Sequence, residues 1–321
     1  GVQERFPGLV LDPDSDQFLP YVLLTQSRLI RVQLLSSVTQ AAQRLPSTQT
    51  VTLPWGGAPT VRQYRDAIDK LSDDSRIDLL LACADPGMSD AQVRQVHQAL
   101  VAHAVTMADN GAPRIAFGSI TSREQDVNAV REHSAAVRNR RFVLVSPAGA
   151  EGAVAGLVGR LNPQDSPTFK PCPLFEIPPA RYRESELDRL LGSATNACVV
   201  QDRVGHGVVV LRGLDTSGDQ ISVTRVADQC IRETKAIAEN FIGELNSEDA
   251  RVALREQIVA TFTRMERAGA LVKSTDGKDP AFTVDVYSTQ LDFAQGIVRV
   301  DIAVRPVRAI DYVYATIRVR N

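Results

Sequence analysis

The sequence has few of the residues that build disulfide scaffolds and metal sites. Its four cysteines, Cys83, Cys172, Cys198 and Cys230, are far apart and form no CxxC pair. We therefore expect reduced thiols, no disulfide and no zinc site. The four histidines also lie at spacings that match no recognised metal motif. We expect neither a metal ion nor another cofactor.

Long apolar runs and a surplus of one charge are missing as well. No stretch approaches the roughly 20 apolar residues that cross a bilayer, and the N-terminus lacks a basic region followed by an apolar core. We expect no export signal and no membrane insertion. The formal net charge of -2 gives no electrostatic reason to bind nucleic acid, so we expect no such partner.

The motifs of common enzymes are absent too. There is no GxSxG elbow, and the glycines around Gly149 and Gly152 fit neither GxGxxG nor GxxxxGK[ST]. A weak phosphate site there stays open, beside the interpretation that small residues let a helix pack closely on a sheet. We expect no enzyme. An α/β enzyme with its site at the strand ends, near residues 85–87 or 146–149, stays open as an alternative.

The first half of the chain alternates apolar runs with amphipathic stretches. Residues 77–84, 114–120 and 141–146 read as buried strands. Ser89 and Gln92 have capping-box spacing before a helical pattern, and Ser122 and Gln125 could cap a second helix that runs through Val137. Strands separated by helices favour parallel pairing. The alternation predicts an α/β domain with a mostly parallel sheet.

The second half has a different organisation. A proline-rich stretch follows residue 161, and beyond it come two short strands hinged at Gly205 and Gly207, then two long amphipathic helices. We predict an α/β outer domain over 1–165, a connector with a short helix over 166–195, and a core over 196–321. The fold class is α+β with an α/β part, the core carrying two long helices and terminal strands.

The last forty residues change from helical to strand periodicity. Apolar residues alternate with polar ones in residues 282–286 and 298–304, and again up to the last residues of the sequence. Ordering the end of a chain is costly unless it docks. The pattern in residues 312–320 therefore predicts a strand that joins a sheet.

Four segments of the second half resemble the C-terminal core of contractile phage tail sheath proteins, including the sheaths of phage-tail-like injection systems. NACVVQDRVGHGVVVLRGLDT looks like that family's strand, glycine turn and strand ending in Thr. RVADQCIRETKAIAENFIGELN and ARVALREQIVATFTRMERAGAL look like its two helices, and GIVRVDIAVRPVRAIDYVYATIRVR looks like its terminal strands. The resemblance covers about the last 125 residues of the sequence.

The resemblance implies a structural subunit that forms helical or stacked hexameric arrays with itself around an inner tube. It implies contraction by subunit rotation, which drives the tube through a target envelope. The implied partners are further copies, the inner tube protein, and baseplate and tail-terminator proteins. The implied location is a virion tail or phage-tail-like particle that is assembled in the bacterial cytoplasm. A tail-cap or baseplate adaptor ring with the same core stays open as an alternative.

In this family, terminal arms add strands to the sheets of neighbouring subunits, and strand addition uses backbone hydrogen bonds. The residues expected in the donated intersubunit strand are Tyr312, Val313, Tyr314, Ala315, Thr316, Ile317, Arg318, Val319 and Arg320. The residues expected in the receiving sheet are Ile297, Val298, Arg299, Val300, Asp301, Ile302 and Val304.

Overall fold

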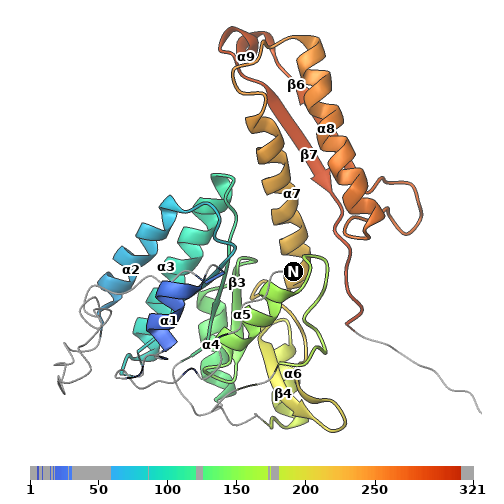
Figure 1. Cartoon of the computed structure of the whole chain (residues 1–321). Helices are drawn as coiled ribbons and strands as arrows, with labels where there is room; N and C mark the ends of the chain where they lie inside the picture. Colours follow the sequence, from blue (N-terminus) through green and yellow to red (C-terminus); the bar gives the residue numbers. More distant parts are fainter. Residues whose placement is uncertain are drawn as a thin grey trace, which may run out of the picture.

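The structure is a computed structural model of the chain. It describes residues 19–27, 29–30, 59–85, 87–120, 126–172, 174 and 181–311, with the isolated positions 6, 9, 15 and 17. Figure 1 shows an α/β body and a slender C-terminal unit that projects from it. The predicted fold class is confirmed.

A five-stranded sheet organises the body, in the order β1-β2-β3-β4-β5. The strands are β1 (Leu79–Leu81), β2 (Ile115–Gly118), β3 (Phe142–Ser146), β4 (Cys198–Arg203) and β5 (Gly207–Val210). The first four run parallel, and β5 is antiparallel to β4. The predicted division at 165 and 196 stays a prediction, but the sheet extends across it, because β4 from the second half pairs with β3 from the first.

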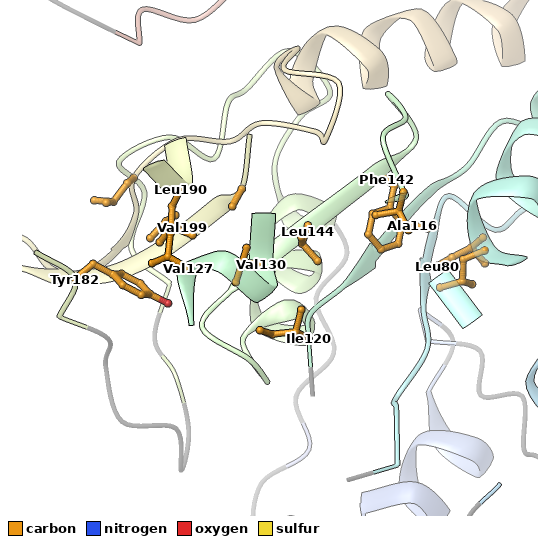
Figure 2. Packing of buried hydrophobic residues seen from close by; sticks show 14 of the residues in the cluster. Leu80, Ala116, Ile120, Val127, Val130, Phe142, Leu144, Tyr182, Leu190 and Val199 are labelled. Carbon is orange, nitrogen blue, oxygen red and sulfur yellow. The ribbon is translucent and has the colours of Figure 1, made fainter. Parts of the chain in front are cut away.

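Helices cover both faces of this sheet. The helices of the body are α1 (Leu19–Gln26), α2 (Val61–Lys70), the short 3₁₀ helix η2 (Leu71–Asp73), α3 (Asp90–Asp109), α4 (Val127–Ala136), α5 (Glu151–Arg160) and α6 (Glu184–Leu191). Successive residues of a strand point to opposite faces. Ala116, Phe142 and Leu144 therefore pack with the α3, α4 and α6 side (Figure 2), while Val143 and Val145 pack with α5.

Two predicted helix starts can be compared with the structure. Ser89 caps α3 in a capping box with Gln92, as the sequence predicted. The second helix, α4, begins at Val127 with Asp126 as its N-cap, and the Asp126 carboxylate accepts from the Asn128 N–H. Ser122 and Gln125 lie outside the described residues. Aspartate caps as well as serine does, and it stands directly before the helix.

The C-terminal unit contains α7 (Ile221–Glu239), α8 (Glu248–Arg267), β6 (Phe282–Tyr287), α9 (Gln290–Ala294) and β7 (Arg299–Val304). The two long helices form a hairpin, and β6 and β7 pair antiparallel beside it. Val226, Ile258 and Phe262 of the helices share one core with Val284 of β6. A two-stranded ribbon is marginal alone, so this packing against helices is what stabilises it.

Helix α7 belongs to both parts of the molecule. Its first residue, Ile221, lies in the core of the body, while Val226 and Cys230 lie in the core of the C-terminal unit. Side chains of α7 also donate to main-chain carbonyls of the body, Arg225 to Leu161 and Asn162, Arg232 to Pro113, and Lys235 to Asn110. The joint between the two parts is thus one continuous helix fixed by polar contacts.

A buried ion pair lies at this joint. Arg141, directly before β3, donates from both terminal nitrogens to the carboxylate of Asp228 on α7, over 3.1 and 3.0 Å. Arg141 also donates to the main-chain oxygen of Arg114. Burial raises the pKa of Asp228, and the hydrogen bond from Arg141 acts against that rise. The pair ties the edge of the body to the root of the C-terminal unit.

Removing one partner of this pair should be costly. We expect Asp228→Ala to lower the free energy of unfolding by about 3 kcal/mol, because Arg141 is left buried without its counter-charge. Joint replacement, Arg141→Met with Asp228→Leu, should restore most of that loss. The control is the exposed Arg62–Asp66 pair on α2, where Asp66→Ala should cost under about 1 kcal/mol. Equal losses at both sites in urea titrations would contradict the assignment.

Two histidines form a second buried polar pair. Nδ1 of His97 on α3 lies 2.8 Å from Nε2 of His133 on α4, and the His97 ring lies against Phe142. A side chain at Gly118 would collide with this ring, since a Cβ there would lie 2.4 Å from Nε2 of His97. Burial lowers the pKa of His97 to about 3 and that of His133 to about 4, with the charge of Arg94 adding to the second shift.

Acid should therefore destabilise the body. Below the ordinary histidine pKa of about 6.5, the two histidines bind protons in the unfolded chain but stay neutral in the folded one. The free energy of unfolding therefore falls as the pH falls toward 4. Burial raises the pKa of Asp215 to about 6, which acts in the opposite direction. From pH 7 to pH 5 we expect a net loss of about 3 kcal/mol in urea titrations. His133→Gln should remove more than half of this loss, since each histidine alone contributes about 2 kcal/mol, and an unchanged loss would contradict the role of the pair.

Candidate intersubunit surface

Strand β7 contains most of the predicted receiving residues. Val300, Ile302 and Val304 face the helices, and Arg299, Asp301 and Ala303 face outward. Ile297 and Val298 precede the strand, and the Ile297 N–H donates to the main-chain oxygen of Asp292 in the turn after α9. The predicted receiving segment is thus a strand over Arg299–Val304.

The register of β7 shows which of its backbone groups are unused by β6. The Arg305 N–H donates to the oxygen of Ala281, which is its direct partner in the antiparallel register. Hydrogen-bonded pairs alternate along such a ladder. The N–H and C=O groups of Val300, Ile302 and Val304 therefore point away from β6. Among the described residues, nothing outside the β6–β7 ladder bonds to them.

One backbone group on the outer edge of β6 is bound by the neighbouring helix. The same alternation turns the backbone groups of Val284 away from β7, and Arg255 of α8 donates from Nε to the Val284 oxygen over 3.2 Å. Past the end of β7, Val272 donates to the oxygen of Arg305, which points to the side of the ribbon where β6 lies, so this bond leaves the outer edge of β7 unoccupied. Within the described part of the chain, the N–H and C=O groups of Val300, Ile302 and Val304 on the edge of β7 are all without a hydrogen-bond partner.

The chain after β7 returns to the body before it reaches residue 312. Arg308 contacts Asp219 at 2.6 Å, and the main chain of Ala309 both donates to and accepts from the side chain of Gln220. Asp311 then pairs with Arg212 at 3.2 Å in a poorly exposed site. These contacts were not predicted. They fix the starting point of the following segment on the body and not on the projecting unit.

The predicted donated strand, Tyr312 to Arg320, lies outside the described residues. Its pairing with β7, in the same chain or another, stays a prediction.

The strand ends that an α/β enzyme would use carry side chains engaged with one another. Ser146 Oγ lies 2.6 Å from the hydroxyl of Tyr182, and Ser119 Oγ accepts from the Gly149 N–H. Pro86 lies outside the described residues, and the Asp85 carboxylate accepts from the Gly87 N–H. Among the described residues no group of three or more His, Cys, Asp or Glu side chains could hold a metal ion. No described helix is both long and apolar enough to cross a membrane.

The comparison with family models bears on the part of the chain that contains β7. Residues 215–320 match the model of the phage tail sheath C-terminal domain. This segment is similar to phage tail sheath C-terminal domains. It begins at Asp215, and it includes α7, α8 and the β6–β7 ribbon. The resemblance to contractile tail sheath proteins that the sequence predicted is confirmed.

Solved structures extend the likeness beyond this sheath domain. The chain is similar to one in the anti-feeding prophage (AFP) baseplate, with a TM-score of 0.65, 17% identity and coverage of 83% of this chain and 75% of that one. The contracted AFP helical sheath is similar with a TM-score of 0.62 and 17% identity, over 83% of this chain and 76% of that one. The contracted sheath complex of the extracellular contractile injection system PVC is similar with a TM-score of 0.56 and 11% identity, over 76% of this chain and 92% of that one.

At these identities the likeness shows the shared fold, which includes the body as well as the sheath domain. None of the curated proteins matches the chain. The findings support a tail sheath or related structural role in a contractile tail particle.

Proline substitutions can test the assigned edge of β7. Val300→Pro removes an N–H that points away from β6, so the ladder should survive and stability should fall only by about 1 to 2 kcal/mol through lost packing. Asp301→Pro removes an N–H that the ladder uses and should cost more, about 3 kcal/mol. Thermal unfolding compares the two variants. A larger loss for Val300→Pro would contradict the register.

Proposed function

We propose that this chain is the structural subunit of a contractile tail sheath, which polymerises around an inner tube and contracts by subunit rotation. The observation that carries the proposal is the open edge of β7 within a segment similar to phage tail sheath C-terminal domains. The strand-like pattern of residues 312–320 supplies a matching donor from a second copy. Edge strands readily accept such additions.

Strand addition suits a subunit that must move without detaching. Three residues of β7 offer six backbone groups, one N–H and one C=O each, to an incoming strand. At a net 0.5 to 1.5 kcal/mol per hydrogen bond, the link is worth roughly several kcal/mol. The starting point of the donated segment is fixed on the body by Arg212 and Asp311. Adjacent copies can then rotate as bodies while the short link holds.

Contraction in this proposal needs no bound fuel. The extended array is kinetically trapped, and a trigger lets the subunits rotate into a shorter and wider packing with more buried interface. The work comes from the difference in interface free energy between the two packings. The driven tube passes through a target envelope. An α/β enzyme is not favoured, since the Ser146 and Tyr182 hydroxyls at the strand ends are engaged with each other and no described group of His, Cys, Asp or Glu side chains could hold a metal ion.

The partners in this proposal are further copies of the chain, the inner tube protein, and baseplate and tail-terminator proteins. The particle is assembled in the bacterial cytoplasm. A second candidate, a baseplate adaptor or tail-cap ring, is favoured by one observation: the AFP baseplate structure is among the similar ones, with a TM-score of 0.65. An adaptor should form closed rings only, whereas a sheath should grow into tubes.

Truncation can test the donated strand without disturbing the fold. A chain that ends at Asp311 keeps the contacts of Arg308, Ala309 and Asp311 with the body. We expect it to unfold at an unchanged temperature and to stay monomeric, while the full chain forms hollow striated tubes in negative-stain electron microscopy. Normal tubes from the truncated chain would contradict the proposal. Closed rings from the full chain would favour the adaptor.

A further inference from the structure

Apolar side chains are exposed at the far end of the C-terminal unit. The tip patch consists of Ile242, Leu245, Leu291, Phe293 and Ile297, of which Leu245 is 84% exposed. Two of its residues come from the α7–α8 connection and two from α9. Asn246 and Ser288 hold these segments together, because the Asn246 amide donates to Ser288 Oγ and Ser288 Oγ donates to the Ile297 oxygen.

The exposure of this patch is enforced by the structure of α9. Asp292 is only 3% exposed, whereas Leu291 and Phe293 on either side point outward. Arg299 donates twice to the Asp292 carboxylate, over 2.8 and 2.7 Å, and Thr289 donates to it as well. The helix is therefore anchored by its aspartate, with its apolar residues turned toward solvent. An exposed apolar patch of this kind marks an interaction surface.

The rim of the tip patch is acidic. Glu239, Glu244, Glu248 and Asp249 are exposed around the α7–α8 connection, and no ion pair engages them among the described residues. Arg251 donates to Asn246, and Arg299 is neutralised by Asp292. The surface is thus apolar at its centre and negative around it.

The turn between β4 and β5 presents a surface of the opposite charge. Its base patch consists of Phe169, Lys170, Arg203, Val204 and His206. Val204 is fully exposed because the tight turn, with Gly205 at positive φ, projects it outward. The Phe169 ring lies 6.1 Å from the His206 ring, which joins the two segments. Asp202, an acid beside this turn, is engaged by Arg181, so the described part of the patch is apolar with a basic rim.

The two patches lie at opposite ends of the molecule. In Figure 1, α9 marks one extreme of the C-terminal unit, and β4 with its turn marks the far end of the body. A patch cannot pair well with its own copy, because like charges would meet. Each patch does complement the other. Contacts between different surfaces of identical chains build rings if the rotation from copy to copy closes, and helices if it does not.

We propose that the tip patch of one copy docks on the base patch of the next, as a second intersubunit contact beside the β7 edge. This inference rests on the proposed assembly of the chain with itself. It assigns a geometry to that assembly: neighbouring copies are joined head to tail, with Leu245 and Phe293 near Val204 and Phe169. The acidic rim orients the approach, and the apolar centres are buried on contact.

Cysteine cross-linking tests this contact independently of the form of the assembly. In a Cys83→Ser background, Leu245→Cys chains and Val204→Cys chains are mixed at assembling concentration and treated with a short bismaleimide. We expect a covalent dimer in the mixture and none from either variant alone. Tubes without any dimer would overturn this contact and leave the sheath proposal standing. Rings with the dimer would support the contact and favour the adaptor. A dimer from one variant alone would overturn the head-to-tail arrangement.

Charge reversal tests the complementarity. Glu239→Lys with Glu244→Lys should reduce sedimentable assembly at least about tenfold, as should Lys170→Glu with Arg203→Glu, and all four changes together should restore it. The matched control is Asp73→Lys with Glu132→Lys, two exposed acids on the body, and it should assemble normally. Failure of the fourfold variant to recover, or equal loss in the control, would overturn the pairing. If the tip variants lose binding to purified tube protein and keep their assembly with one another, the pairing is overturned and the tip patch is a contact with the tube.

Discussion

Unpaired backbone groups at the edge of a sheet need hydrogen-bond partners, and this chain supplies some of them itself. The edge of β5 is taken by residues 169–172, where the Phe169 and Cys172 N–H groups donate to β5. On the outer edge of β6, Arg255 of α8 donates to the oxygen of Val284. Within the described residues, β7 keeps an open stretch at Val300, Ile302 and Val304. The proposed assembly follows from that stretch.

The joint at α7 determines how the two parts of the molecule move together. One uninterrupted helix enters both cores, and Arg141 and Asp228 fix its angle through a buried pair with two hydrogen bonds. Pulling on the C-terminal unit therefore pulls on the body directly. A subunit that rotates as one piece needs such a connection, while its flexibility lies in the link to its neighbour. The joint at α7 thus provides the rigid connection within a subunit, and the open edge of β7 provides the flexible connection between subunits.

Much of the fold could be predicted because its signals are local. Ser89 and Gln92 predict the start of a helix from a pattern only four residues long. The alternation of apolar and polar residues in 282–286 and 299–304 predicts the β6–β7 ribbon. The docking of residues 307–311 on the body could not be predicted. Its contacts join residues almost ninety positions apart, as between Ala309 and Gln220, and no local sequence pattern signals such pairing. The orientation of α9, with its aspartate buried and its apolar residues exposed, was not predicted for a similar reason. Asp292 has the sequence pattern of a surface residue, and its burial depends on the contact with Arg299.

The most direct test of the central claim is hydrogen exchange at the β7 edge, measured on the full chain as a monomer and in its assembled form. The account predicts that the amides of Val300, Ile302 and Val304 exchange quickly in the monomer and become strongly protected on assembly. The amides of Asp301 and Ala303, already bonded to β6, should be protected in both states. Unchanged exchange at Val300, Ile302 and Val304 in assembled particles would contradict it.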